Sequence, residues 1–192
     1  MKIEIKKGTW RLAILLPCCG LALKLPRIHF YQGLKDLKNY LRKDWRAKKL
    51  KNIFRALFKH TVFTPDSLKG WFFRGMVENW QEWTFYRKSK NPFLLPTYFS
   101  IFGWLNIQQL GMEPEIEEQI FLTQLLIFSQ SKTWGKHYAL RKNFSFRNGK
   151  LQILDYGDPK VQRIVTKYGK IIQEKFDINY CEEVQNGNQK RV

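Results

Sequence analysis

The stretch NGKLQILDYGDP, residues 148–159, joins a tight turn to an apolar strand and then to an acidic exit. Asn148-Gly149 is a strong signal for a two-residue hairpin turn, because both residues tolerate positive φ angles. The apolar residues at 151–154 then predict one arm of a hairpin that spans residues 144–154. A turn at Gly157 and Pro159 is the simplest end for that strand, and it leaves the role of Asp155 open.

The composition is that of a folded and strongly basic chain. Of the 192 residues, 44% are hydrophobic and 16% are aromatic, which is typical of globular proteins. Thirty-four Lys and Arg against sixteen Asp and Glu give a formal net charge of +18. This charge predicts attraction to polyanions such as nucleic acid, anionic lipid, nucleotide phosphates or an acidic protein, and does not choose among them.

The cysteines and the N-terminal apolar run bear on the compartment. Cys18, Cys19 and Cys181 lack the spacing of a zinc site or a disulfide framework, which indicates reduced thiols and a cytoplasmic protein. Residues 12–25 resemble a secretory signal, but Pro17 and Lys24 interrupt the apolar run. The run is also too short to cross a bilayer as a helix, so we expect no transmembrane segment.

Hydrophobic periodicity predicts an α+β chain. Strands are expected at residues 2–6, 10–16, 21–25, 97–102 and 105–110, and helices from a cap at residues 64–66 to Asn91 and at 115–130 and 159–176. In the third strand, Lys24 shares one face with Ala22, opposite a face of three leucines. Lys24 therefore either reaches solvent at a sheet edge or points into a cleft.

Residues 33–60 carry much of the positive charge. Leu34, Leu37, Leu41 and Trp45 recur near helical spacing between Lys and Arg residues. A solvated amphipathic helix or helix pair is the simpler interpretation, and a surface for nucleic acid, an acidic partner or an anionic membrane is the alternative.

The order of these elements, together with four residues, resembles the protein kinase-like superfamily in a small divergent bacterial or viral form, or a pseudokinase. Lys24 in LALKLP, Glu82 in ENWQEW, Asn143 in ALRKNFSF and Asp155 in ILDYGDP carry the resemblance. It implies a two-lobed α+β fold with a minimal C-terminal lobe. The expected parts are an N-terminal lobe at 1–110 with a basic insertion at 27–63, a reduced C-terminal lobe at 111–180, and a flexible tail at 181–192.

The resemblance also implies ATP and Mg²⁺ as ligands, bound between the sheet of Lys24 and the hairpin. Lys24 would contact the phosphates, Glu82 would orient Lys24, and Asn143 and Asp155 would hold the metal. The strand at Asn106, Ile107 and Gln108 would supply backbone contacts to the base. For single residues the simpler interpretations are an edge lysine at Lys24, a surface carboxylate at Glu82, for which Glu78 competes, and a cap or hairpin asparagine at Asn143.

The chain also departs from the kinase pattern. Tyr138 stands five residues before Asn143, where the family has the aspartate that accepts the substrate proton, and His137 is a weak substitute. The first turn has only Gly8 in place of a glycine-rich loop. The predicted function is therefore a kinase-like nucleotide-binding protein, either a phosphotransferase with a degenerate catalytic loop or a pseudokinase. The alternative is a basic binding module for nucleic acid or an anionic membrane surface, and no acceptor substrate is indicated.

Overall fold

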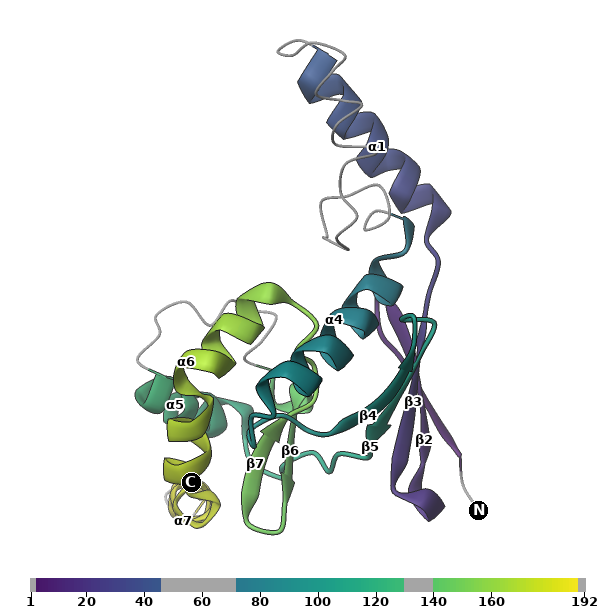
Figure 1. Cartoon of the computed structure of the whole chain (residues 1–192). Coiled ribbons are helices and arrows are strands. Elements are labelled where there is room, and N and C mark those ends of the chain that lie inside the picture. The colour runs from purple at the N-terminus through teal and green to yellow at the C-terminus, as the bar shows by residue number, and fades with distance from the viewer. Residues whose placement is uncertain (1–2, 46–71, 130–139, 190–192) are drawn as a thin grey trace. The chain divides into compact units, whose positions relative to one another are not determined.

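The computed structural model describes residues 3–45, 72–129 and 140–189 (Figure 1). The chain divides into two compact units, and each is treated by itself. Unit 1 comprises residues 1–83 and 98–108, and unit 2 comprises residues 84–97 and 109–192.

Unit 1 is built on a five-stranded sheet with the strand order β1-β2-β3-β5-β4. The strands are β1 (Glu4–Lys7), β2 (Arg11–Leu16), β3 (Leu21–Pro26), β4 (Thr97–Ile101) and β5 (Leu105–Gln109). The first three form an antiparallel meander, in which Ala13 pairs with Lys24. The β2–β3 connection is a single 3₁₀ turn, Pro17–Cys19, closed by Gly20 at a φ of 64°.

Helix α4 (Arg74–Ser89) packs its first turns on this sheet. Gly75 allows the close approach, because a Cβ there would lie 2.1 Å from the backbone oxygen of Trp10. Gly103, in the β4–β5 turn, has a φ of 82° and would place a Cβ equally close to the carbonyl oxygen of Met76. These two positions set how near the polar face of α4 comes to the strands.

Helix α1 (Phe30–Trp45) follows β3 directly. It covers the first part of the basic segment expected to be helical at residues 33–60, and the remainder of that segment lies outside the described residues. The predicted helix cap at residues 64–66 also lies outside them, so the described part of that helix is α4 alone.

Unit 2 contains the hairpin that the sequence predicts. Strands β6 (Phe144–Arg147) and β7 (Lys150–Ile153) pair antiparallel, with Phe144 opposite Ile153. Asn148 and Gly149 both have positive φ, at 52° and 71°, as a two-residue turn between twisted strands requires. Residues 93–95 run alongside β7, since the Ile153 N–H donates to the Phe93 carbonyl at 2.8 Å.

Three helices complete unit 2: α5 (Glu118–Ser129), α6 (Pro159–Lys175) and α7 (Ile178–Gln189). Figure 1 shows them grouped beside the hairpin. The core between them is apolar and aromatic, including Phe93, Phe121, Phe144, Leu125, Ile153, Tyr156, Val165 and Ile172. Leu126 is 41% exposed although its neighbour Leu125 is buried, because successive side chains on a helix point about 100° apart.

The predicted α+β class is confirmed, and the predicted strands and the helices at 115–130 and 159–176 appear within a few residues of their expected ends. Residues 181–189, expected to belong to a flexible tail at residues 181–192, form part of helix α7. Cys181 is fully buried and donates to Gln124 Oε1 at 3.1 Å, so packing against α5 holds this polar segment in a helix.

Candidate functional site

Lys24 points from β3 toward α4 rather than out into solvent. It shares a sheet face with the buried Ala22, as the two-residue period predicted, and its side chain is 11% exposed. The Lys24 Nζ donates to both carboxylate oxygens of Glu82, at 3.0 Å each. The interpretation of Lys24 as a solvated edge lysine is therefore wrong.

Glu82 is fully buried on α4, so it is not a surface carboxylate. Besides Lys24, it accepts from Arg11 Nη1 at 2.9 Å. Burying a carboxylate is costly unless cations and hydrogen bonds compensate for the lost water, and here two cations converge on one carboxylate.

Glu78, the alternative partner for Lys24, has another role. It lies one turn earlier on α4 and pairs with Arg74 Nε at 2.9 Å and with Arg11 Nε at 3.7 Å. Among the contacts of the described residues, Glu82 therefore holds the lysine, and Glu78 holds the outer side of Arg11.

Asn79 fixes α4 against the sheet. Its fully buried amide donates to the carbonyl of Lys24 at 3.1 Å and to the carbonyl of Gly103 at 2.9 Å, while its Oδ1 accepts from Arg11 at 3.4 Å. The amide therefore bonds to the backbone of the same residue whose amine Glu82 holds. Sequence reasoning missed Asn79 and Arg11, although Asn79 lies three residues before Glu82 on the same helix face.

The segment at Asn106, Ile107 and Gln108 lies on β5, between β3 and β4. Backbone groups of an interior strand are hydrogen-bonded to strands on both sides, so few remain for a ligand. The Asn106 side chain is buried and donates to the Asn79 carbonyl at 2.7 Å, while its Oδ1 has no hydrogen-bond partner among the described residues. Contacts from this strand to a nucleotide base stay a prediction, and the topology favours side chains over backbone as their source.

In unit 2, the hairpin brings Asn143 and Asp155 to the same end. Asn143 closes a 3₁₀ turn before β6, and its carbonyl accepts from the Leu154 N–H at 2.8 Å. Asp155 follows Leu154 in the chain, so it lies one residue from the backbone hydrogen bond that Leu154 makes to Asn143 across the hairpin. Both side chains are partly exposed.

The acidic exit after β7 contains two aspartates with different roles. Asp158 caps α6, because its Oδ1 accepts from the Lys160 N–H at 2.6 Å ahead of Pro159. Tyr156 is fully buried, and its hydroxyl donates to the carbonyl of Leu95 at 2.7 Å. Asp158 and Tyr156 thus account for the turn structurally, and the partly exposed Asp155 directly follows the hairpin.

Residues 3–45, 72–129 and 140–189 contain no cluster of three or more His, Cys, Asp or Glu side chains arranged to hold a metal ion. Asn143 and Asp155 would supply two oxygen ligands, a set that Mg²⁺ completes with water and phosphate oxygens. His137 and Tyr138, the residues at the position of the kinase catalytic base, lie outside the described residues.

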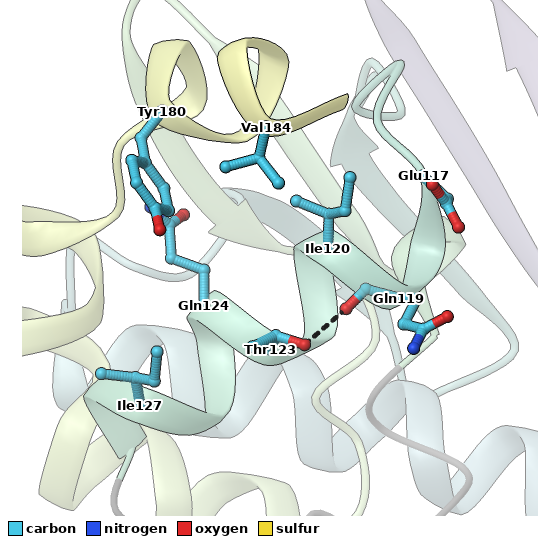
Figure 2. A pocket seen from close by; sticks show the side chains of 8 residues that line it. All are labelled: Glu117, Gln119, Ile120, Thr123, Gln124, Ile127, Tyr180 and Val184. Carbon is cyan, nitrogen blue, oxygen red and sulfur yellow. Dashed lines mark hydrogen bonds between the residues drawn. The ribbon is translucent and has the colours of Figure 1, made fainter. Parts of the chain in front are cut away.

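A pocket of about 280 Å³ lies between α5 and α7 in unit 2 (Figure 2). Ile120, Ile127 and Val184 give it an apolar lining, and Glu117 is the charged residue at its edge. A negative edge without a cation disfavours nucleotide phosphates. None of the predicted site residues lines this pocket.

Two of the three cysteines have altered acidity. The hydrogen bond between Cys18 and Cys19, with Sγ atoms 3.4 Å apart, is the main cause that raises the pKa of Cys19. Burial raises the pKa of Cys181 to about 11. Neither shift is the depressed value expected of a reactive cysteine, so these two thiols are poor candidates for a nucleophile.

Comparisons of the sequence and the structure with known proteins found no matching family model, no matching curated protein and no matching solved structure.

Proposed function

We propose that this chain is a kinase-like protein that binds a magnesium nucleotide, with Lys24 on the phosphates and with Asn143 and Asp155 on Mg²⁺. One observation carries the proposal. The Lys24 amine is held by both oxygens of a fully buried glutamate on a helix, at 3.0 Å each. A nucleotide triphosphate needs a fixed cation of this kind, because phosphoryl-transfer proteins act mainly through positioning and charge.

The charges around Lys24 support anion binding. In unit 1, Lys24 and Arg11 pair with Glu82, and Arg11 and Arg74 pair with Glu78, so cationic side chains cluster around Lys24. Glu82 is deeper than the cations that it holds, since the side chains of Lys24 and Arg11 are each 11% exposed. A cation anchored from beneath loses little freedom when a phosphate arrives.

The hairpin supports the metal part of the proposal. Asn143 and Asp155 supply an amide oxygen and a carboxylate oxygen, which are ligands that suit Mg²⁺. Asp155 is the candidate because it lies one residue from the backbone hydrogen bond between Leu154 and Asn143, whereas Asp158 caps α6. In this proposal the metal accompanies the nucleotide whose phosphates Lys24 contacts, and a two-lobed kinase-like fold is part of the same proposal.

The proposal commits to nucleotide binding first. Without an aspartate five residues before Asn143, the chain would act either as a slow phosphotransferase or as a pseudokinase. Asn106 and Gln108 are buried polar side chains on β5, the strand that is expected to contact the base.

Calorimetric titration of ATP into the full chain, with and without Mg²⁺, tests the proposal. We expect Mg²⁺-dependent binding in the wild type, a loss of at least about tenfold in Lys24→Met, and a loss of the Mg²⁺ dependence in Asp155→Ala. Asp158→Ala is the matched control, because it removes a carboxylate three residues away that caps a helix. Equal affinity in the wild type, Lys24→Met and Asp155→Ala, or no binding by the wild type, would overturn the proposal.

A further inference from the structure

Helix α1 exposes large apolar side chains at its start. Phe30 is 64% exposed, Tyr31 is 83% exposed and Leu34 is 57% exposed. An isolated exposed apolar residue needs no explanation, but three within one and a half turns of a helix form a patch. The patch adjoins Ile28, which is 41% exposed in the segment before the helix.

Cations lie beside this patch on the same helix. Lys35, Lys38 and Arg42 are all exposed. At 3.6 residues per turn, Phe30 and Leu34 fall about 40° apart, and the three cations fall within about 60° of one another on the neighbouring flank.

A contact with Phe72 in unit 1 shows which side of α1 packs against the rest of the unit. Gly33 is buried, and a Cβ at this position would lie 2.6 Å from the ring of Phe72. The ring of Phe30 is tilted against the same Phe72 ring, at 6.2 Å between centroids. At 3.6 residues per turn, Gly33 falls about 60° from Phe30 on the side opposite the cations, so this contact leaves the cationic flank on the side away from Phe72.

We propose that α1 binds the surface of an anionic lipid bilayer. Phe30 and Leu34 enter the boundary between headgroups and acyl chains, and Lys35, Lys38 and Arg42 contact lipid phosphates. An apolar stripe with cations on its flank is the pattern of helices that lie in a membrane interface, and the basic net charge of the chain adds attraction to anionic lipid. No helix in the described ranges is long and apolar enough to cross a membrane, so the proposed contact is with the surface.

The apolar residues favour lipid over nucleic acid. Cations alone explain attraction to a phosphate backbone, and an aromatic ring can stack on a base. Leu34 can do neither, yet it is more than half exposed in the middle of the patch. Burial of Leu34 and Phe30 in lipid gives both side chains a favourable environment.

Vesicle co-sedimentation of the full chain tests the proposal, with phosphatidylcholine vesicles that contain or lack phosphatidylserine. Each cation near an anionic surface contributes about a fivefold gain, so neutralising Lys35, Lys38 and Arg42 with glutamine should weaken binding by on the order of 100-fold. The control replaces Lys150, Lys160 and Arg163 with glutamine. These residues are exposed on unit 2, and the control makes the same change in net charge.

A second variant separates lipid from nucleic acid. Phe30→Ser with Leu34→Ser keeps every charge, and it should lose at least about tenfold in vesicle binding while binding to a single-stranded oligonucleotide stays unchanged. Circular dichroism confirms that each variant is folded. Three results would overturn the proposal: equal binding to both vesicle types, an equal loss in the control variant, or unchanged vesicle binding in the double serine variant. The last result, combined with tight oligonucleotide binding, would assign α1 to nucleic acid.

Discussion

Replacing Glu82 with glutamine removes one negative charge from the buried face of α4 with almost no change in side-chain shape. In the wild type, the carboxylate lies 3.0 Å from Lys24 Nζ and 2.9 Å from Arg11 Nη1, and it is fully buried. At an effective dielectric constant of about 20, each such contact is worth roughly 5 kcal/mol of Coulomb energy before desolvation is counted. Removing one partner of a buried pair costs about 3–5 kcal/mol, since the remaining charge stays out of water.

Glu78 moderates this cost. It remains 3.7 Å from Arg11 Nε in the variant, so the main loss falls on the contacts to Lys24. We therefore expect Glu82→Gln to lower the free energy of unfolding of unit 1 by about 3 kcal/mol, the lower end of the range. That is a large share of the 5–15 kcal/mol by which domains are usually stable.

Urea unfolding followed by tryptophan fluorescence measures this change in unit 1. The tryptophans with described surroundings, Trp10, Trp80, Trp83 and Trp104, all lie in that unit. Glu78→Gln is the matched control, because its side chain is 16% exposed and its loss should cost about 1 kcal/mol. A cost below about 1 kcal/mol for Glu82→Gln would refute the argument that the carboxylate balances two buried cations.

Three further predictions concern other positions. Gly75→Ala should destabilise unit 1 by about 1–3 kcal/mol and weaken the contact between Lys24 and Glu82, because the new Cβ would lie 2.1 Å from the Trp10 carbonyl oxygen; thermal unfolding measures the cost. Asp158→Ala should cost about 1 kcal/mol by removing the cap of α6, and calorimetry should find ATP affinity unchanged. Burial raises the pKa of Cys181 from 9.0 to about 11, so between these pH values the unfolded thiol ionises first and stability falls. Urea unfolding across that range should show a smaller fall in Cys181→Ala.

The parts of the fold that the sequence predicts well are those in which local chemistry and packing agree. Asn148-Gly149 requires positive φ at both residues, and that requirement fixed the hairpin register that brings Asn143 next to Asp155. The two-residue period of β3 likewise predicts from the sequence alone that Lys24 lies on the same face as Ala22.

The residues that were missed depend on register and tertiary packing. Arg11 joins Glu82 because Ala13 pairs with Lys24 and Arg11 lies two residues away on the same sheet face. The 3₁₀ turn at Pro17–Cys19 sets that register, and its length is not readable from hydrophobic periodicity. The helix through Cys181 was missed for a related reason, since its sequence is mostly polar and its helix forms where it packs against α5.

Stability alone does not explain why Lys24 and Glu82 form a charged pair between α4 and the sheet. A buried ion pair seldom stabilises a fold more than apolar side chains of the same size would, because desolvation offsets most of the attraction. Lys24 and Glu82 could be replaced by apolar residues on this ground, and the sheet and helix would still pack. What apolar residues cannot provide is a cation held in one place, with its glutamate fully buried and its amine nearer the surface. The same amide that bonds to the Lys24 carbonyl also ties α4 to the β4–β5 turn, so the backbone of the lysine is fixed as well as its amine. This two-point support is what a phosphate-binding lysine needs, and it is the reason that we propose a ligand-binding role for Lys24.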